Sequence, residues 1–224
     1  MRLTVIAHIH TDFPAKFGIP RQSGLADTKA EIVFEPEYRN PDACRGLEEF
    51  SHLWLIWGFS RTVREKWSPT VRPPRLGGNQ RTGVFATRSP FRPNPLGLSC
   101  VALERLEKRK GLGIVLHVTG ADLMDATPIY DIKPYLPYVD CHAGASGGFA
   151  EKRKEYRLRV EIPDVWMERV PWDHRKILVQ ILSQDPRPSY QNDPERVYGM
   201  EYAGMEIRFQ VQESVLRVCE IRVK

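Results

Sequence analysis

The residues best suited to chemistry lie in one short segment, residues 82–97, where two arginines and an asparagine stand among three prolines. A short apolar run, residues 84–86, precedes Arg88, Arg92 and Asn94. A helix is excluded here, because proline removes a backbone donor and restricts the residue before it. We therefore predict the end of a strand followed by a rigid loop. Two guanidinium groups and an amide on such a loop suit an anionic or amide-bearing ligand, although a plain turn with surface arginines is the alternative.

Three further loops combine proline with arginine, amide or carboxylate side chains, at residues 20–23, 125–128 and 185–188. Loops on one rim of a β-barrel can converge, so we predict that the first two join the loop around Arg88 in a single site. Asp125 could accept a hydrogen bond from a ribose hydroxyl or an amine, or could cap a local turn. The neighbouring Asp122 is interpreted as a structural residue.

The chain carries a net charge of +5, and its cationic residues concentrate between residues 61 and 92. Arginine dominates this basic segment, and its planar guanidinium group binds phosphate and stacks on bases better than an ammonium group does. The segment predicts a nucleic-acid-binding surface, with a solvated basic face as the alternative. Its single acid, Glu65, stands against Arg61, Arg64, Lys66, Arg72, Arg75, Arg81, Arg88 and Arg92.

Several common types of site have no support in the sequence. The four cysteines are scattered without a CxxC pair, so we expect neither a metal site nor a disulfide framework. The chain has no GxGxxG or GxSxG motif, and the glycine pair at residues 77–78 lacks the lysine and serine of a phosphate-binding loop. No apolar run is long enough to cross a bilayer and no signal-peptide pattern is present, so we expect a cytoplasmic protein without a membrane partner.

Short strands dominate the expected secondary structure. Many strands with few helices between them argue against a doubly wound parallel sheet and favour a mainly β fold, an antiparallel β-barrel. A glycine-rich segment at residues 144–148 has the composition of a linker. We therefore expect a barrel over residues 1–140 and a smaller α+β domain over residues 150–224. The predicted strands are 3–9, 31–34, 52–59, 83–86, 97–107, 113–119, 129–135, 160–163, 197–202, 205–212 and 215–223, with a helical turn at 47–50 and an amphipathic helix at 173–184.

Specific motifs along nearly the whole chain give it a family resemblance. The chain resembles the tRNA N6-methyltransferases that act on threonylcarbamoyladenosine beside the anticodon. The motifs that carry this resemblance are KFGIPRQ (residues 16–22), RGLE (45–48), FSHLW (50–54), RPPRLGGN (72–79), GVFATRS (83–89), RPNP (92–95), DIKPYLP (131–137) and QDPRP (184–188).

The resemblance implies an S-adenosylmethionine-dependent enzyme that binds its cofactor on a β-barrel, forms a homodimer and takes tRNA as its partner. This chain has Ala126 where the family commonly has glycine, so a positive φ at this position would strain the backbone. The family's cofactor contacts match Pro20, Arg21, Gln22, Ser60, Arg88, Leu98, Asp125, Ala126, Thr127 and Pro128 in this sequence.

The implied reaction agrees with the residue types present. Methyl transfer from a sulfonium is a displacement that needs alignment more than a strong base. An oxygen that accepts the N–H of the weakly nucleophilic adenine N6 would help, and Asn94, Asp125 and Asp185 are unranked candidates. Arg88 and Arg92 could bind the methionine carboxylate or an RNA phosphate. Phe85 and Phe91 could stack bases, whereas Trp54 and Trp57 fit the core better. The RNA-contacting candidates are Arg72, Arg75, Arg92 and Arg187.

Two other functions remain open at this point. The basic segment by itself also fits a non-catalytic RNA-binding β-barrel protein. A small-molecule methyltransferase would share the barrel, but it would not need the arginine-rich segment.

Overall fold

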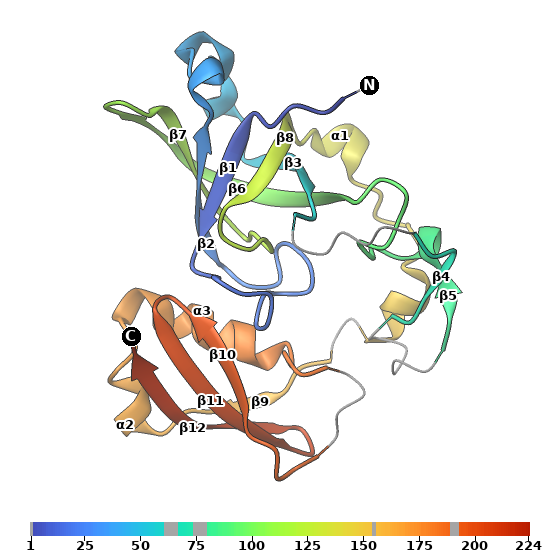
Figure 1. Cartoon of the computed structure of the whole chain (residues 1–224), viewed down its shortest axis with the longest axis vertical. Helices are drawn as coiled ribbons and strands as arrows, with labels where there is room; N and C mark the ends of the chain where they lie inside the picture. Colours follow the sequence, from blue (N-terminus) through green and yellow to red (C-terminus); the bar gives the residue numbers. More distant parts are fainter. Residues whose placement is uncertain (1, 61–66, 74–79, 154–155, 189–192) are drawn as a thin grey trace.

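The computed structural model describes residues 2–60, 67–73, 80–153, 156–188 and 193–224. Figure 1 shows a β-barrel above a smaller unit in which helices pack on a sheet. The barrel is closed and wholly antiparallel, with the strand order β1-β2-β7-β6-β3-β8. The predicted mainly β fold is confirmed. Its strands are β1 (Ala7–Thr11), β2 (Lys29–Phe34), β3 (His52–Gly58), β6 (Leu96–Arg109), β7 (Gly113–Thr119) and β8 (Thr127–Pro134).

Alternating side chains explain why these segments form a barrel. In β2 and β3 every second side chain is buried, which is the two-residue period of a strand with one face in a core. The inward residues, among them Ile32, Leu53 and Leu55, are fully buried. Trp57 is also buried and lies over Gly97, where any Cβ would overlap the indole ring. The expectation that both tryptophans of β3 belong to the core is confirmed for Trp57 and wrong for Trp54, which is half-buried and donates its Nε1 hydrogen to Asp140 (3.0 Å).

One rim of the barrel carries three long connections. Antiparallel neighbours alternate in direction, so the ends of β1, β3 and β7 lie at the same rim as the starts of β2, β6 and β8. The connections 12–28, 59–95 and 120–126 therefore leave from this rim, which faces the second unit (Figure 1). Two backbone hydrogen bonds join the first of these connections to the third, from Gly24 N to Gly120 O (2.9 Å) and from Asp125 N to Phe13 O (2.9 Å).

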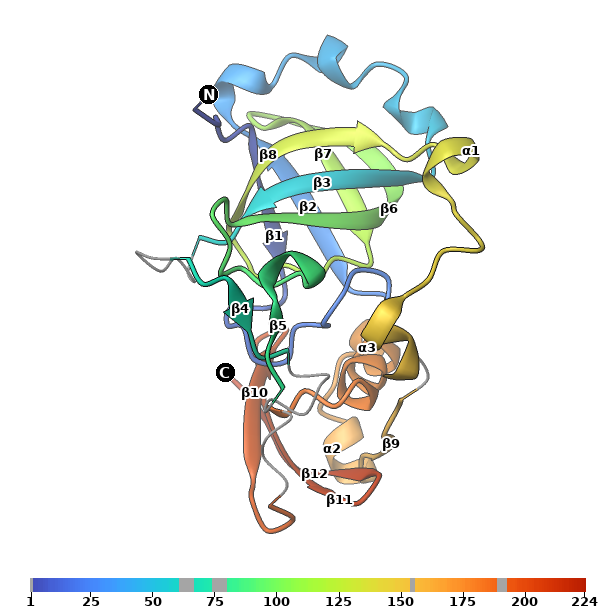
Figure 2. The same ribbon diagram turned by 90° about the vertical axis from the view of Figure 1, so that its right-hand side faces the viewer.

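Short elements fill the connections and the segment between the two units. In Figure 2 the pair β4–β5 lies below the barrel, on the side of the second unit. These elements are η1 (Pro36–Tyr38), η2 (Pro41–Cys44), η3 (Leu47–Glu49), β4 (Thr70–Val71), β5 (Thr82–Gly83), η5 (Val84–Ala86), α1 (Pro137–Asp140) and η6 (Gly148–Arg153).

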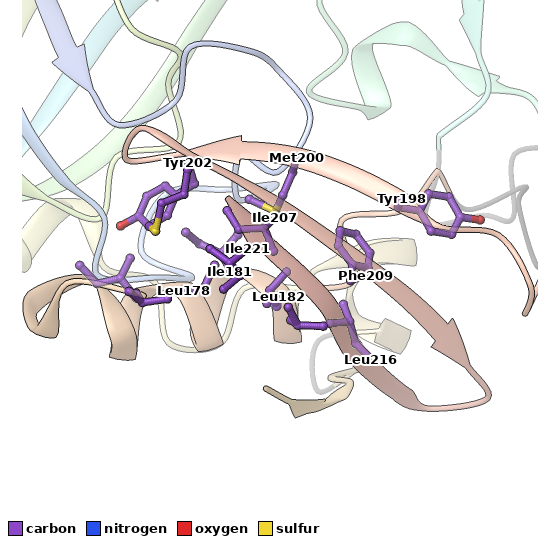
Figure 3. Packing of buried hydrophobic residues seen from close by; sticks show 14 of the residues in the cluster. Leu178, Ile181, Leu182, Tyr198, Met200, Tyr202, Ile207, Phe209, Leu216 and Ile221 are labelled. Atoms are coloured by element: carbon purple, nitrogen blue, oxygen red, sulfur yellow. The ribbon is translucent and has the colours of Figure 1, made fainter. Parts of the chain in front are cut away.

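The second unit is a four-stranded sheet covered by helices. The strand order is β10-β11-β12-β9, and only the pairing of β12 with β9 is parallel. In Figure 3, Leu178, Ile181 and Leu182 of α3 face Ile207 and its neighbours on the sheet. Phe13 and Ala26, from the connection between β1 and β2, join this second core. The elements are β9 (Arg159–Glu161), α2 (Asp164–Met167), α3 (Trp172–Ser183), β10 (Tyr198–Tyr202), β11 (Met205–Gln212) and β12 (Val215–Val223).

The helix expected at residues 173–184 is present as α3, but the strand predicted at residues 3–9 has other bounds and the one predicted at 83–86 was wrong. The strand expected at residues 3–9 begins at Ala7 and runs to Thr11. The segment 83–86 is not a strand, because only Thr82 and Gly83 find a pairing partner, in the short β4. Val84 then opens a 3-10 turn in which Thr87 N donates to Val84 O (3.1 Å).

A buried ion pair stabilises the loop through which the second unit contacts the barrel. Arg187 and Asp185 form two parallel hydrogen bonds (2.8 and 3.0 Å), and their side chains are only 8% and 13% exposed. Tyr156 Oη donates to the same carboxylate (3.0 Å). Burial opposes ionisation of Asp185, yet Arg187 holds the pKa of this carboxyl below its usual range. From the barrel side, Arg21 donates to the carbonyl oxygens of Asp185 and Arg187 (2.9 and 3.1 Å).

A charged cluster covers the outer wall of the barrel. Arg109 bridges Glu31 (2.8 Å) and Glu107 (2.9 Å), and His117 Nε2 lies 2.7 Å from Glu107. Hydrogen bonds from Arg109 and His117 lower the pKa of Glu107 from 4.5 to about 2. The hydrogen bond from Arg109 likewise lowers the pKa of Glu31.

The buried pair predicts a large difference between two arginine substitutions. Arg187→Met should lower the free energy of unfolding by about 3–5 kcal/mol, because it leaves the Asp185 carboxylate buried without its cation. The matched control is Arg217→Met, whose partner is Glu161 on an exposed part of the sheet. That change should cost about 0–1 kcal/mol. Urea denaturation measures both, and equal losses would contradict the structural role of Arg187.

The charged cluster predicts a loss of stability in acid. The folded-state pKa of Glu107 lies below its unfolded value, so its ionised form stabilises the fold above pH 4.5. This contribution should disappear as the pH falls from 4.5 towards 2. In thermal melts across this range, Glu107→Gln should flatten the decline of the melting temperature. Glu37→Gln, on the exposed turn η1, should leave the decline unchanged. A steep decline retained by Glu107→Gln would exclude this carboxylate as its source.

Candidate active site

A wide cleft of about 1370 Å³ lies beside the rim that carries the long connections. Two of the predicted loops line it, the first with Arg21 and Gln22 and the second with Arg88. Residues of β4 and the end of the glycine-rich segment contribute to the rest of the wall. The remaining lining residues are Lys16, Ser68, Thr70, Val71, Arg72, Pro73, Arg81, Phe85, Ala86, Thr87, Ser89, Pro90, Phe91, Gly147, Phe149 and Ala150.

The cleft is strongly cationic. It is lined by Lys16, Arg21, Arg72, Arg81 and Arg88, and no carboxylate is present among the described lining residues. Cations of one sign on the walls of a cleft focus a positive potential there and attract anionic ligands. The chemistry of the cleft therefore suits a carboxylate or a phosphate.

Arg88 is held in place across the cleft by the first loop. Its guanidinium group donates to Gln22 Oε1, which joins the predicted loops at residues 20–23 and around Arg88. The same first loop is anchored to β6, since Cys100 N donates to Ser23 Oγ (3.2 Å). The arginine side chain is exposed, so its remaining donors are accessible to a ligand.

A chain of polar groups runs from the barrel core towards Arg88. Trp57 Nε1 donates to Ser99 Oγ (2.9 Å), and Ser99 Oγ donates to Asp122 Oδ1 (2.6 Å). Burial raises the pKa of Asp122, while the charge of Arg88 acts in the opposite direction. The structure thus places Asp122 as a half-buried acid near Arg88, bonded to Ser99, and this agrees with its interpretation as a structural residue.

The loop at residues 125–128 lies on the same rim but does not line the cleft. Asp125 Oδ1 accepts from Thr11 N (3.1 Å) and lies 3.3 Å from His10 Nδ1. Thr127 donates its hydroxyl to Met124 O (2.7 Å), which closes the turn. Ala126 has a φ of 60°, so the expected strain at this position is present. A left-handed alanine costs about 1–2 kcal/mol relative to its usual conformation.

The other cofactor candidates are placed around this rim. Pro20 is buried in the first loop, and Pro128 is the second residue of β8, opposite His8 of β1. Ser60 is exposed two residues after β3 ends. Leu98 is half-exposed on β6, and the residue opposite it on β3 is Ile56.

The three acceptor candidates have different surroundings. Asn94 is exposed in the proline loop, and its backbone oxygen accepts from Leu96 N (2.8 Å). Asp125 faces the end of β1, as described above. Asp185 accepts hydrogen bonds from Arg187 and Tyr156, so its carboxylate is engaged within the second unit.

The four arginines predicted to contact RNA also differ in their surroundings. Arg72 is exposed on the cleft, and Arg75 lies outside the described residues. The guanidinium group of Arg92 donates to Thr87 O (3.0 Å) and Ser89 O (3.3 Å), so it holds the shape of its own loop. Arg187 is only 7% exposed, and this burial does not fit the surface contact predicted from the sequence. Its loop has the proline-arginine composition of a binding loop, but the arginine turns inward to Asp185.

Sequence reasoning missed Lys16 and Phe149 as cleft residues. Lys16 stands in the quoted motif at residues 16–22, but no local pattern indicates which way its side chain points. Phe149 follows the glycine-rich segment, whose composition predicts a linker rather than a wall. A large aromatic residue directly after such a segment was the available signal.

Two further types of feature were searched for among the described residues, metal sites and membrane-spanning helices. Within the described ranges, no group of three or more histidine, cysteine, aspartate or glutamate side chains could hold a metal ion. No helix in the described part of the chain is long and apolar enough to span a membrane.

Comparisons with known proteins place this architecture in a family. The family model for the tRNA-methyltransferase O N-terminal domain matches residues 8–141, and the model for the TrmO C-terminal domain matches residues 155–224. The tRNA (adenine(37)-N6)-methyltransferase of Escherichia coli K12 is 39% identical over 95% of this chain and 94% of its own length. The protein of the same name from Eikenella corrodens is 45% identical over 74% of this chain and 93% of its own.

Solved structures agree with the sequence comparison. A crystal structure of TrmO from Pseudomonas aeruginosa superimposes with a TM-score of 0.81 at 31% identity, over 100% of this chain and 97% of that one. Both parts of the chain, its barrel and its smaller unit, are thus matched together, and the chain belongs to the tRNA-methyltransferase O family.

Proposed function

We propose that the protein transfers a methyl group from S-adenosylmethionine to N6 of threonylcarbamoyladenosine at position 37 of tRNA, beside the anticodon. The observation that carries the proposal is the cationic cleft at the loop-bearing rim, in a chain related over 95% of its length to a tRNA (adenine(37)-N6)-methyltransferase. A small-molecule substrate would leave the exposed arginines Arg72 and Arg81 without a role.

The cleft residues fit the chemical groups of the cofactor. S-adenosylmethionine supplies, when bound, a methyl group activated by a positively charged sulfur, and it also carries a carboxylate. Arg88 offers a guanidinium fork to that carboxylate, and Gln22 sets the orientation of the fork. Arg21 steadies the first loop by its hydrogen bonds to the carbonyl oxygens of residues 185 and 187. The absence of a carboxylate among the described lining residues leaves the charge of Arg88 available to the ligand.

The chain's own contribution to the methyl transfer is alignment. Holding two reactants in a productive geometry can lower a barrier by several kcal/mol, about 7–11 in favourable cases. A hydrogen-bond acceptor near adenine N6 would draw its N–H and orient its lone pair. Asp125 is one candidate for this role, because the backbone amide of Thr11 fixes its carboxylate at the same rim. Its loop does not line the cleft, so the substrate base would have to extend from the cleft along the rim to reach it. Asn94 is the second candidate, since Asp185 is engaged with Arg187.

The proposal extends to assembly, location and domain organisation. We take the enzyme to be a cytoplasmic homodimer, as the family resemblance implies and as a tRNA substrate favours. The barrel unit over residues 1–140 would hold the cofactor, and the unit over residues 150–224 would brace the first loop through Asp185 and Arg187.

The reaction itself is the first test. Purified protein incubated with S-adenosylmethionine and tRNA that contains threonylcarbamoyladenosine should produce a nucleoside heavier by one methyl group. Mass spectrometry of digested tRNA measures this product, and tRNA lacking the threonylcarbamoyl group serves as the control. A folded protein that shows no calorimetric binding of S-adenosylmethionine would instead be a non-catalytic RNA-binding barrel.

Arg88 is the second test. Arg88→Ala should weaken S-adenosylmethionine binding by about 10- to 100-fold, because hydrogen bonds to a charged group contribute about 1.5–3 kcal/mol. Arg88→Lys should recover only part of this loss, since it keeps the charge but not the fork. Arg45→Ala, an exposed arginine between η2 and η3, is the matched control and should bind normally. Unchanged affinity in Arg88→Ala, measured by calorimetry, would remove Arg88 from the cofactor site.

A further inference from the structure

Two large aromatic rings lie in solvent at the edge of the cationic cleft. Phe85 is 72% exposed and Trp67 is 50% exposed. Their ring centroids are 6.3 Å apart and their planes differ by only 27°, so the two rings form an exposed stack. Phe85 lines the cleft directly, and Trp67 precedes Ser68, which also lines it. Burial of one such side chain is worth about 1.5–3 kcal/mol, so their exposure points to a partner.

The fold holds Phe85 out towards solvent. The ring projects from the 3-10 turn η5, whose first residue, Val84, is 1% exposed and anchors the turn. Val84 N donates to Pro69 O (3.0 Å), and this bond ties the turn to the segment that follows Trp67. Backbone contacts thus bring the two rings together at the surface.

Charge surrounds the aromatic stack. The guanidinium carbon of Arg92 lies 6.0 Å from the centre of the Phe85 ring, and its nitrogen is held by the carbonyl oxygens of Thr87 and Ser89. Arg72 and Arg81 are exposed on the same cleft. Exposed rings among arginines are the chemistry of single-stranded nucleic-acid recognition, in which bases stack on rings and phosphates bind cations.

We propose that Phe85 and Trp67 form a stacking platform for one unpaired base of the substrate RNA, next to the methyl-transfer site. This inference rests on the proposed function and names the residues that recognise the RNA loop. A base that stacks on the platform leaves the helical stack of its own loop, and this opens the neighbouring nucleotides to the cleft. The platform is a positioning element and takes no part in the methyl transfer.

The test measures binding of an anticodon stem-loop RNA with 2-aminopurine in its loop, in the absence of cofactor. Phe85→Ala and Trp67→Ala should each weaken binding by about 5- to 150-fold, the range for the loss of one base–aromatic stack. Phe85→Tyr keeps a ring and should retain binding. The quenching of 2-aminopurine fluorescence on binding, which reports stacking, should disappear in Phe85→Ala.

Three controls separate stacking from other effects. Trp172→Ala removes a ring that is even more exposed (83%), with Arg175 at 5.5 Å, from α3 in the second unit, and this variant should bind RNA normally. Arg72→Ala should make the dependence of binding on salt shallower by about one unit of slope, whereas Phe85→Ala should leave the slope unchanged. The affinity of Phe85→Ala for S-adenosylmethionine should equal that of the unaltered protein.

Two results would overturn the platform: unchanged RNA binding by Phe85→Ala, or an equal loss of cofactor affinity, which would place the ring in the cofactor pocket. The proposed function fails separately. If the unaltered protein binds the stem-loop through Phe85 but transfers no methyl group to modified tRNA, the platform stands and the enzyme assignment falls. If it methylates tRNA with the same KM after Phe85→Ala, the assignment stands and the platform falls.

Discussion

The alternating direction of the barrel strands is the constraint on which the site depends. Because each strand runs opposite to its neighbours, three connections far apart in the sequence must leave from one rim. That rim can afford long, irregular connections because the closed barrel beneath them satisfies its own backbone hydrogen bonds. The regular strands thus supply the apolar barrel core, and the irregular connections carry most of the cations of the cleft.

A second layer of organisation comes from the smaller unit. Phe13 and Ala26 leave the barrel to enter the core of this unit, and Arg21 binds the backbone beside the Asp185–Arg187 pair. The first loop is therefore fixed from both sides. Gln22 follows Arg21 directly and holds Arg88, so the buried ion pair acts on the cleft through only two intervening side chains. The unit thus supports the proposed cofactor site by fixing the first loop through Arg21.

Local patterns worked where a segment's own periodicity determines its structure. The two-residue period of β3 and the amphipathic pattern of α3 identify these elements without tertiary information. They failed at residues 83–86, where apolar residues resemble a strand but the partner strand is two residues long. The same limit applies to Arg187, because composition describes a loop as basic but does not say which way its arginine turns.

Residue order alone determines the barrel class, the helix α3, the basic segment and the loops that hold Arg88, Gln22 and Asp125. The sequence also identifies Ala126 as a position where a positive φ would strain the backbone, and the observed φ is 60°. The inward turn of Arg187 towards Asp185, only two residues away, depends on the burial of their loop. Which of these loops line the cleft, and the stack of Phe85 on Trp67, depend on contacts between segments that are apart in the sequence. Such contacts follow from strand register and from the packing of the two units, and no local pattern of residue types encodes them.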